Sequence, residues 1–407
     1  MKKPIYSLLC SQRKPFSAWA FQKGRLSLQK LKDKATIDET IHQVNVVFPD
    51  QFGRLTGLKV NAEFFVEAME AASKADRPAA FEFKFNPFRF DVLGKHIDFE
   101  DDFKLPKSVK LVPEIETLRE QPWLSNEAVV LADVRDPETD EPLPYSPRRM
   151  LKAQLEKLES HEQLESQVLF SFILHKFGKE EKEQHHASNK GLLTLEQGQG
   201  KVLHDFRKNL QSVGVPLQAM DQTQVTNQFR FQLRRIRGDL LQQCDVFHMT
   251  KHAMKYVGYL HEYDISHLPI SSSDQYNDLI LNIKGIEVHP SQLQNVLFFA
   301  PNVNSIRRLR RRKNGEIFKP AQEGGFEIAI AAPDVNLYLS LSALLSTSPE
   351  NGKDLVMPRN YQEALHGFDT FKDSMDLKVY QYYKALFEHE LKEFDENFTK
   401  WEVNRIY

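Results

Sequence analysis

Two histidines and an aspartate on one predicted helix are the first residues that could do metal chemistry. Asp245, His248 and His252 are spaced by three and four residues, which places their side chains on one helix face. Two histidines four residues apart can bind zinc. No glutamate stands beside the first histidine, and the sequence offers no obvious further ligand. The pattern therefore favours an exposed or interfacial helix face, with a metal site as the less common alternative.

A run of basic residues is the second candidate. Arg307–Lys313 contains six basic residues in seven positions, a density that can hold phosphate groups or nucleic acid. The run lacks interleaved aromatic residues, and the whole chain has a net charge of −2, which argues against nucleic acid. A phosphate-bearing small ligand, an acidic partner, and a solvated or interface loop are the alternatives, and the loop is the commonest of them.

Carboxylates on one face of a sheet would be the usual way to hold Mg-ATP, and two predicted strands bear on this. The strand 228–233 alternates, so that Arg230 shares a polar face with two glutamines and with no acid. On the strand 326–332, Glu327 shares its face with alanines. An acid in such surroundings needs a specific partner, and a Glu327–Arg230 pair is one possibility.

The glycine content argues against the common phosphate-binding loops. Only 17 of the 407 residues are glycine, which is about 4% against a usual value of about 7%. Gly198 and Gly200 form a G-x-G in which Leu203 replaces the third glycine, and no glycine-rich loop ends in Lys-Ser or Lys-Thr. Dinucleotide-binding and P-loop folds are therefore not expected.

Charge, cysteine content and hydropathy indicate a soluble, cytoplasmic protein. Charged residues make up 27% of the chain and nearly balance in sign, which is typical of a globular protein. Two cysteines, Cys10 and Cys244, are too few for a disulfide framework or a zinc site. No apolar run approaches the ~18 residues of a membrane span, and the apolar stretch 5–10 is too short for a signal peptide.

The elements that would position these residues follow from hydrophobic periodicity. Strands are expected near residues 44–48, 127–133, 168–174, 228–233, 278–283 and 326–332. Helices are expected near residues 62–73, 146–165, 201–213, 239–263, 334–346 and 371–401. The fold class that this mixture predicts is α+β.

The pattern also divides the chain. Residues 1–36 are basic and weakly patterned, which predicts an N-terminal extension. Three prolines and four acids within 136–144 indicate a linker, and Ser146-Pro147 then supplies a helix cap followed by proline at the first helical position. We therefore expect a small mixed domain at 37–144 and a larger domain at 145–407.

Six segments form an ordered set with a family pattern. They are D-x-x-G-R-x-x-G with N-A-E-F-F at 50–65, D-P through S-P-R-R at 136–149, G-V-P-L at 214–217, P-x-V-N-S-x-R-R-L at 301–309, D-V-N-L-Y-L at 334–339, and T-x-W-E-x-x-R at 399–405. The set resembles the glutamine synthetase family, especially the class I branch with the γ-glutamylpolyamine synthetases. The resemblance implies an N-terminal β-grasp domain and a catalytic-type domain on a curved antiparallel sheet with flanking helices.

The metal-binding acids of that family are not retained in this sequence. Where the family strand reads E-x-E-F-x-L, this chain has Leu169 and Ser171 in place of both acids, and two later acids become Thr223 and Arg230. Family catalysis uses ATP to phosphorylate the glutamate side chain before ammonia or an amine displaces the phosphate, which requires divalent cations held by acids. A guanidinium in a cation site would repel Mg²⁺.

This sequence also departs from the histidine and arginine motifs of the family. Leu279 and Leu281 stand where the family has histidines, and the family's arginine-bearing N-R-x-x-x-x-R segment is deleted between Arg308 and Glu327. The later R-x-E-x-R becomes G-x-E-x-A, which keeps only Glu327. The resemblance therefore implies a homologue that has lost ligase activity and acts as a regulatory, scaffolding or ligand-sensing subunit in nitrogen or polyamine metabolism.

The retained residues define a candidate ligand pocket of Asn304, Arg308 and Glu327, to which Arg230 is added. Arg230 would take the charge-neutralising place of a metal, so that the pocket could bind an anion. No cofactor is then expected. The alternative is a glutamate–ammonia or glutamate–amine ligase with an atypical site, which would need ATP and Mg²⁺ or Mn²⁺.

The resemblance also bears on partners. In the family, each active site lies between the N-terminal domain of one subunit and the sheet of the next. A homologue that has lost catalysis can therefore still assemble. We expect a homo-oligomeric ring, such as a dodecamer, or a hetero-oligomer with an active paralogue, and no membrane. A third, weaker hypothesis is an adaptor that holds RNA or an acidic partner through Arg307–Lys313.

Overall fold

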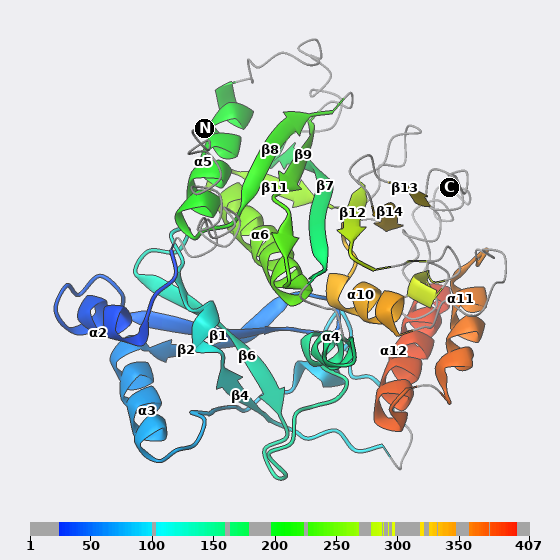
Figure 1. The fold of residues 1–407 in the computed structure, drawn as a ribbon, viewed down its shortest axis with the longest axis horizontal. Helices are drawn as coiled ribbons and strands as arrows, with labels where there is room; N and C mark the ends of the chain where they lie inside the picture. Colours follow the sequence, from blue (N-terminus) through cyan, green and yellow to red (C-terminus); the bar gives the residue numbers. More distant parts are fainter. Residues whose placement is uncertain are drawn as a thin grey trace, which may run out of the picture.

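The structure, a computed structural model, describes fourteen stretches of the chain. They are residues 24–99, 103–158, 163–178, 197–223, 227–267, 278–286, 288, 292, 295–297, 318–320, 325–331, 333–346, 358–373 and 375–396. These residues form two sheets with flanking helices (Figure 1), which confirms the predicted α+β class. None of the described helices is both long and apolar enough to cross a membrane.

The first sheet is built from the N-terminal third of the chain. Its strands are β1 (Gln43–Pro49), β2 (Leu55–Asn61), β3 (Phe81–Phe83), β4 (Val109–Pro113), β5 (Arg119–Glu120) and β6 (Glu127–Arg135). The order is β2-β1-β6-β4-β3, with β5 paired to β6. β1 and β6 run parallel and the other pairs are antiparallel. Short 3-10 turns follow at Pro87–Arg89 and Ile115–Thr117.

Two helices, α2 (Leu28–Thr36) and α3 (Ala62–Lys74), pack together, and α3 also lies against β1 and β2. α2 falls within the segment that the sequence pattern assigns to an extension. Ser27 caps this helix by accepting a hydrogen bond from the Lys30 amide, and Leu31 and Ala35 are buried. The folded region therefore begins before residue 37. Residues spaced by four lie on the same helix face, so this apolar pair can anchor a short helix to the core.

The second sheet is built from residues 165–331 and is antiparallel throughout its described pairs. Its strands are β7 (Glu165–Lys176), β8 (Leu217–Gln222), β9 (Gln228–Leu233), β10 (Ile236–Arg237), β11 (Tyr263–Ser266), β12 (Leu279–Lys284), β13 (Phe318–Pro320) and β14 (Phe326–Ala331). The order is β13-β14-β12-β7-β9-β8, and β10 and β11 also pair with β7. β7 lies inside the sheet, between β12 and β9.

Helices cover this sheet and connect it to the first one. They are α4 (Pro147–Glu156), α5 (Gln197–Ser212), α6 (Leu240–Leu260), α10 (Leu337–Leu345), α11 (Tyr361–Phe368) and α12 (Leu377–Glu396), with a 3-10 turn at Asp369–Phe371. The predicted helix 146–165 is too long, since α4 ends at Glu156 and Glu165 already begins β7. The predicted helix 334–346 begins later, at Leu337, because the Asn336 side chain caps it.

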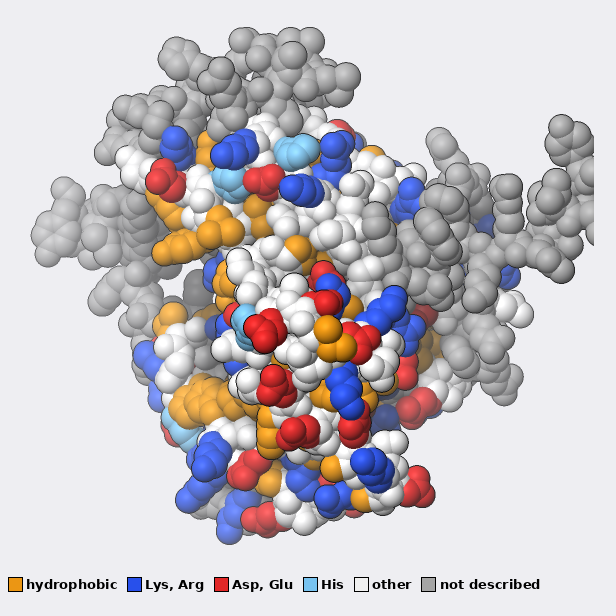
Figure 2. Space-filling model, turned by 90° about the vertical axis from the view of Figure 1, so that its left-hand side faces the viewer, with side chains coloured by type: hydrophobic (Ala, Val, Ile, Leu, Met, Phe, Trp, Pro, Cys, Tyr) orange, Lys and Arg blue, Asp and Glu red, His pale blue; other side chains and the backbone are white. Residues whose placement is uncertain are grey.

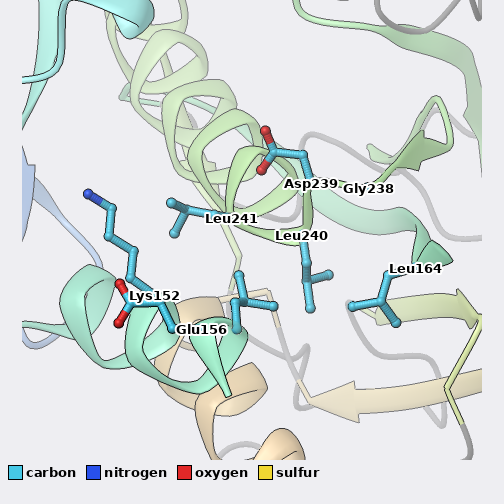
Figure 3. A pocket seen from close by; sticks show the side chains of 8 residues that line it. Lys152, Glu156, Leu164, Gly238, Asp239, Leu240 and Leu241 are labelled. Atoms are coloured by element: carbon cyan, nitrogen blue, oxygen red, sulfur yellow. The ribbon is translucent and has the colours of Figure 1, made fainter. Parts of the chain in front are cut away.

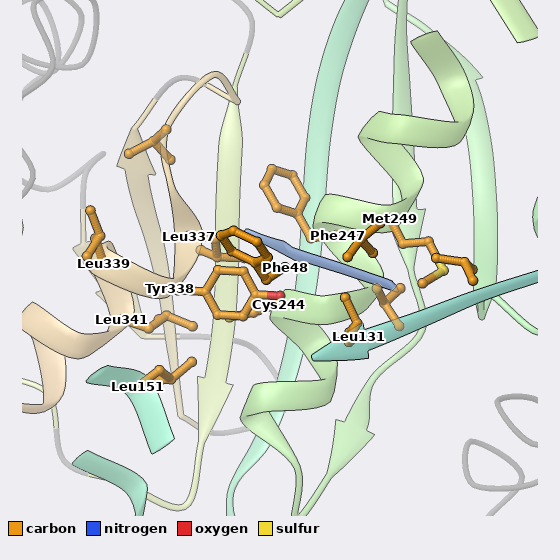
Figure 4. Packing of buried hydrophobic residues seen from close by; sticks show 14 of the residues in the cluster. Phe48, Leu131, Leu151, Cys244, Phe247, Met249, Leu337, Tyr338, Leu339 and Leu341 are labelled. Carbon is orange, nitrogen blue, oxygen red and sulfur yellow. The ribbon is translucent and has the colours of Figure 1, made fainter. Parts of the chain in front are cut away.

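The two halves of the molecule share one continuous hydrophobic core. Figure 4 shows Phe48 and Leu131 of the first sheet beside Phe247 of α6 and Tyr338 of α10. The C-terminal helix adds to this contact, because the Tyr382 ring stacks on Tyr145 with centroids 4.6 Å apart. Of the predicted apolar stripe on this helix, residues 383, 386 and 387 are buried, and its last members lie outside the described residues or have undescribed side chains.

A polar cluster holds α12 against a loop of the first half. Asp91 accepts hydrogen bonds from the backbone amides of Leu93 and Lys95, and its other carboxylate oxygen lies 3.2 Å from Nε2 of His389 on α12. Next to this pair, the Tyr361 hydroxyl donates to the Glu390 carboxylate at 2.9 Å. Burial raises the pKa of Glu390 to about 7, helped by the nearby Asp91 charge and opposed by the Tyr361 hydrogen bond.

This environment predicts a pH-dependent effect of Glu390→Gln. Below the ordinary glutamate pKa, Glu390 is protonated in both folded and unfolded chains; as pH rises toward 7, only the unfolded chain ionises, so stability is lost. The loss is complete above about pH 7. We expect Glu390→Gln to raise the free energy of unfolding by about 1–2 kcal/mol near pH 8 and by much less near pH 5. Urea unfolding at both pH values measures this difference, and an equal effect at the two would contradict the assignment.

Candidate functional site

One face of the second sheet carries polar side chains and is the candidate site. We call this the polar sheet face and define it by Gln167, Ser171, Arg230, Gln232 and Asn282. Cross-strand pairing places them together, because Asn282 lies opposite Gln167 and Ser171 lies opposite Arg230. Directly opposed residues on antiparallel strands point to the same side.

The other face of the sheet is apolar and faces the helices. Phe170 contacts Phe247 of α6 and Phe172 contacts Phe206 of α5, with ring centroids 5.2 and 6.2 Å apart. Phe229 and Phe231 of β9 are buried on the same side. Alternation along β7 and β9 therefore forces their polar residues onto the opposite face, as the sequence predicts for the strand 228–233.

Side-chain amides are linked across the polar sheet face. The Gln167 Nε2 atom donates to the Gln218 side chain at 2.8 Å and to the Leu233 carbonyl at 3.0 Å. Asn282 Nδ2 donates to Gln167 Oε1 at 3.4 Å. Asn282 Oδ1 is buried and has no hydrogen-bond partner among the residues that the structure describes. This oxygen is therefore a vacant acceptor among the described residues of the polar sheet face.

The guanidinium on this face is already paired. Arg230 donates to both carboxylate oxygens of Asp221 on β8, from Nη2 at 2.5 Å and from Nε at 3.2 Å. Both side chains are nearly half exposed, at 44% and 49%. Thr223, beyond the end of β8, donates from its hydroxyl to Gln228 at 2.5 Å. The Asp221 carboxylate therefore neutralises the Arg230 charge.

An exposed pair of this kind contributes little to stability, and this gives a second prediction. Asp221→Asn removes the carboxylate charge with little change in shape. We expect the free energy of unfolding to change by less than about 1 kcal/mol, since exposed ion pairs are screened by solvent. Urea unfolding at low salt measures the change, and a loss of several kcal/mol would show that the pair is buried in solution.

A second polar cluster lies buried between the two halves. Arg148 of α4 donates to both carboxylate oxygens of Asp245 on α6, at 2.8 and 2.9 Å, and the Tyr338 hydroxyl donates to the same carboxylate at 2.6 Å. Arg148 also pairs with Glu114 and Asp133 of the first half. Burial alone would lower the pKa of Arg148, but Asp245 outweighs it and raises the pKa. The cluster holds the two halves of the molecule together, and we call it the buried joint.

The predicted metal-site residues of α6 belong to this joint. His248 is buried, its Nε2 accepts a hydrogen bond from the Leu337 amide at 3.2 Å, and burial keeps its pKa well below the ordinary value. His252 Nε2 lies 3.4 Å from the Gln121 side chain in the first half. No group of three or more His, Cys, Asp or Glu residues that could hold a metal occurs in the described part of the chain. Asp245 and His248 therefore lie buried in the contact between the two halves.

Solved structures share this arrangement of elements, although no protein-family model and no curated protein matches the chain. GmaS, a γ-glutamylmethylamide synthetase of the glutamine synthetase family, in its form without ligand, matches with a TM-score of 0.67 and 16% identity over 92% of this chain and 98% of that chain. A GmaS/ADP complex matches with a TM-score of 0.66 and 15% identity, over the same shares. This chain has the glutamine synthetase-like fold.

Within the glutamine synthetase-like fold, the four residues that the sequence resemblance assigns to family acid positions lie on one side of the sheet. Ser171 and Leu169 of β7 oppose Arg230 and Gln232 of β9, and Thr223 continues the alternation of β8 from Asp221. Of these, Ser171 is buried, and its hydroxyl accepts a hydrogen bond from the Asp278 amide at 2.6 Å.

Three expectations about the site need correction or lie outside the described residues. Leu279 and Leu281 do not face the polar side: they pair with Phe170 and Val168 and are fully buried, so Ile280 and Asn282 occupy the polar face of β12. Glu327 does not pair with Arg230, because the Lys319 ammonium on the adjacent strand lies 2.7 Å from its carboxylate. Asn304, Arg308 and the run Arg307–Lys313 lie outside the described residues.

The described residues of this glutamine synthetase-like sheet do not fit a metal–ATP site. Mg²⁺ prefers oxygen ligands and binds proteins mainly through carboxylates, whereas the polar sheet face holds amides, a hydroxyl and a guanidinium. Two acids lie beside this face and both are paired: Asp221, opposite Arg230, bonds that guanidinium, and Glu327, opposite Asn282, bonds Lys319. The partner of Arg230 was missed from sequence because β8 is an exposed edge strand without clear alternation.

Proposed function

We propose that this glutamine synthetase-like protein has lost ligase activity and acts as a regulatory, scaffolding or ligand-sensing subunit. The observation that carries the proposal is the donor set of the polar sheet face, in which Ser171, Thr223 and Arg230 stand at positions of family acids. ATP-dependent phosphorylation of glutamate needs metal-bound phosphates and stabilised phosphoryl charge. An Arg230 already neutralised by Asp221 supplies neither a metal ligand nor an unpaired cation.

The amide network supports a ligand-sensing role without a cofactor. Gln167 and Asn282 can each donate and accept hydrogen bonds, and the Asn282 carbonyl oxygen is a vacant acceptor among the described residues. A small ligand with amide or amino donors would satisfy it. Thermal shifts against a panel of amino acids and nucleotides test this role. A specific amino-acid shift that Asn282→Leu removes is expected, and a flat panel would count against ligand sensing.

Assembly is the second part of the proposal. A chain that keeps this fold can keep the ring assembly of glutamine synthetases, alone or with an active paralogue, and could then act in nitrogen or polyamine metabolism. Sedimentation of the purified chain, and its co-purification with a catalytic synthetase from the same cells, test the two forms of assembly. A monomer that co-purifies with no synthetase would rule out the scaffolding role.

The alternative function is an ATP-dependent glutamate–amine ligase with an atypical site. The likeness to GmaS over 98% of its length favours it. Phosphate release from ATP, measured with glutamate, an amine panel and Mg²⁺ or Mn²⁺, separates the two functions. We expect release at the no-enzyme rate. Metal-dependent release that Glu327→Ala abolishes would establish the ligase and overturn the proposal.

A further inference from the structure

The C-terminal end of α6 carries large apolar side chains that face solvent. Tyr256, Tyr259 and Leu260 are 38%, 70% and 67% exposed, and Phe177, just past the end of β7, is 48% exposed. Single exposed apolar residues are ordinary on a protein, but several in one place mark an interaction surface.

Rings stand in line along this part of α6. His252, Tyr256 and Tyr259 are spaced by four and three residues, so they share one helix face and span about 10 Å of its length. The ring centroids of His252 and Tyr256 lie 4.9 Å apart, and the Phe177 ring continues the line at 6.2 Å from Tyr259. We call these four residues the aromatic row.

The neighbouring helix α5 presents basic side chains to solvent. Its apolar residues are buried, and its opposite side carries the basic face, which we define by Lys201, His204, Arg207 and Lys208. In the described part of the chain, neither these lysines and arginine nor Lys255, beside the aromatic row, form an ion pair. Figure 2 looks at this side of the molecule and shows Lys, Arg and His side chains gathered near the top.

The basic face and the aromatic row adjoin each other. Asp205 of α5 lies 2.8 Å from Nε2 of His261, the residue that follows α6. The Phe177 amide donates to the Glu262 carbonyl at 2.9 Å, which holds Phe177 at the same end. The two groups therefore form one surface at the contact of α5 with the C-terminal end of α6, which lie side by side in Figure 1.

The charge of this surface indicates the kind of partner. Asp205 is engaged by His261, and the next exposed acids along the chain, Glu262 and Asp264, come after the end of α6. The unpaired cations therefore dominate. A symmetric contact with a second copy of the chain would set like charges against each other, so an anionic partner fits better.

This surface is separate from the sites already described. α6 packs on the apolar side of the second sheet, since Phe247 contacts Phe170, so the polar sheet face lies on the other side. A cavity of about 250 Å³, lined mainly by leucines, lies between α4 and the start of α6 (Figure 3), at the opposite end of that helix. The inference is thus independent of the function proposed for the polar sheet face.

We propose that this surface binds a single-stranded nucleic acid, with bases stacked on the aromatic row and phosphates on the basic face. Every base has a flat face that can stack on an aromatic ring, and unpaired bases leave that face accessible. Lys and Arg side chains follow the phosphates, so affinity falls as salt rises. The whole chain has a net charge of −2, so binding depends on this local group of cations.

The first test is a fluorescence anisotropy titration of the full chain with labelled oligothymidylate of about twelve nucleotides, at low salt. An abasic strand of the same length carries the same phosphates without bases. We expect saturable binding of oligothymidylate, and at least about tenfold weaker binding of the abasic strand, because stacking is lost. No saturable binding, or equal affinity for the abasic strand, would overturn the proposal. Equal competition by poly-L-glutamate would do so as well, since it would identify a surface for acidic proteins.

A variant of the aromatic row tests where the bases lie. Tyr259→Ala removes an exposed ring and should leave the thermal melt unchanged, while affinity for oligothymidylate falls at least about fivefold. The matched control is Phe64→Ala, which removes an exposed ring from α3 and should leave affinity unchanged. Unchanged affinity in Tyr259→Ala would exclude the row. A change in sedimentation of that variant without a change in affinity would identify a contact between copies and also overturn the proposal.

The basic face is tested through salt dependence. Lys201→Gln with Lys208→Gln removes two phosphate contacts, and the slope of log affinity against log salt should become shallower by about 1.4. Lys372→Gln with Lys378→Gln changes two exposed lysines near α12 and should keep the slope of the unaltered chain. Equal slopes for the two double variants would show that the phosphates do not lie on α5.

Discussion

Arg148→Ala is expected to lower the free energy of unfolding by about 3–5 kcal/mol, because removal of one partner strands a buried charge. Arg148 is 2% exposed and bonds Asp245 through two hydrogen bonds at 2.8 and 2.9 Å. Without the guanidinium, the Asp245 carboxylate would keep only the Tyr338 hydroxyl, at 2.6 Å, as a side-chain donor among the described residues. Urea unfolding with tryptophan fluorescence measures the loss.

A double variant tells whether the loss comes from the stranded charge. Replacing both members with apolar residues of similar size, Arg148→Met with Asp245→Leu, removes the uncompensated carboxylate, and buried pairs replaced in this way are often tolerated. We expect the double variant to be more stable than Arg148→Ala. A double variant that is less stable than either single change would mean that packing, and not charge, dominates this joint.

Gly53→Ala is expected to cost about 2–4 kcal/mol by opening the contact between the two halves. Gly53 has a φ of +76°, in the left-handed region, and an added Cβ would lie 2.5 Å from Cε1 of His248 and 3.3 Å from Cα of Asn336. Both neighbours are fixed, because His248 is buried against Tyr338 with ring centroids 4.8 Å apart. Urea unfolding again gives the free energy.

Gly94 provides the matched control for this change. Its φ of +85° is similar, but an added Cβ there would meet no atom within 4 Å. Gly94→Ala should therefore show only the backbone strain, about 1–2 kcal/mol. If Gly53→Ala and Gly94→Ala lose equal stability, the close approach of Gly53 to His248 does not matter in solution.

Much of the fold could be predicted from local pattern. The strand 228–233 matches β9 residue for residue, because its Phe and Leu positions alternate strictly with polar ones. The long helix around Cys244 also matches α6, with Asp239 at its cap. β9 has one apolar face and α6 has a clear N-terminal cap, and both are features that a single sequence records.

The errors arise where the deciding neighbour is distant in the sequence. β12 is apolar at four of its six positions, so its alternation does not tell which residues face the helices, and only pairing with β7 places Leu279 and Leu281 there. The buried joint was missed because Arg148 and Asp245 are 97 residues apart. Charged residues in a sequence are usually read as surface, and nothing in a local window shows that two of them neutralise each other.

The sequence predicts which positions form the candidate site, but it does not predict which side chains those residues contact. Sequence alignment pointed to Leu169, Ser171, Thr223 and Arg230, and these positions lie along one face of the second sheet. What each side chain does there depends on neighbours from other strands. Asp221 neutralises Arg230, and Lys319 neutralises Glu327.

Equilibrium binding of Mn²⁺ is the decisive measurement, because the donors of the polar sheet face are not those that hold a divalent cation. The electron paramagnetic resonance signal of free Mn²⁺ falls when the ion is bound by protein. We predict that titration into the full chain gives the same signal as titration into buffer. A saturable loss of signal equivalent to one or more ions per chain, removed by Glu327→Ala, would contradict the account.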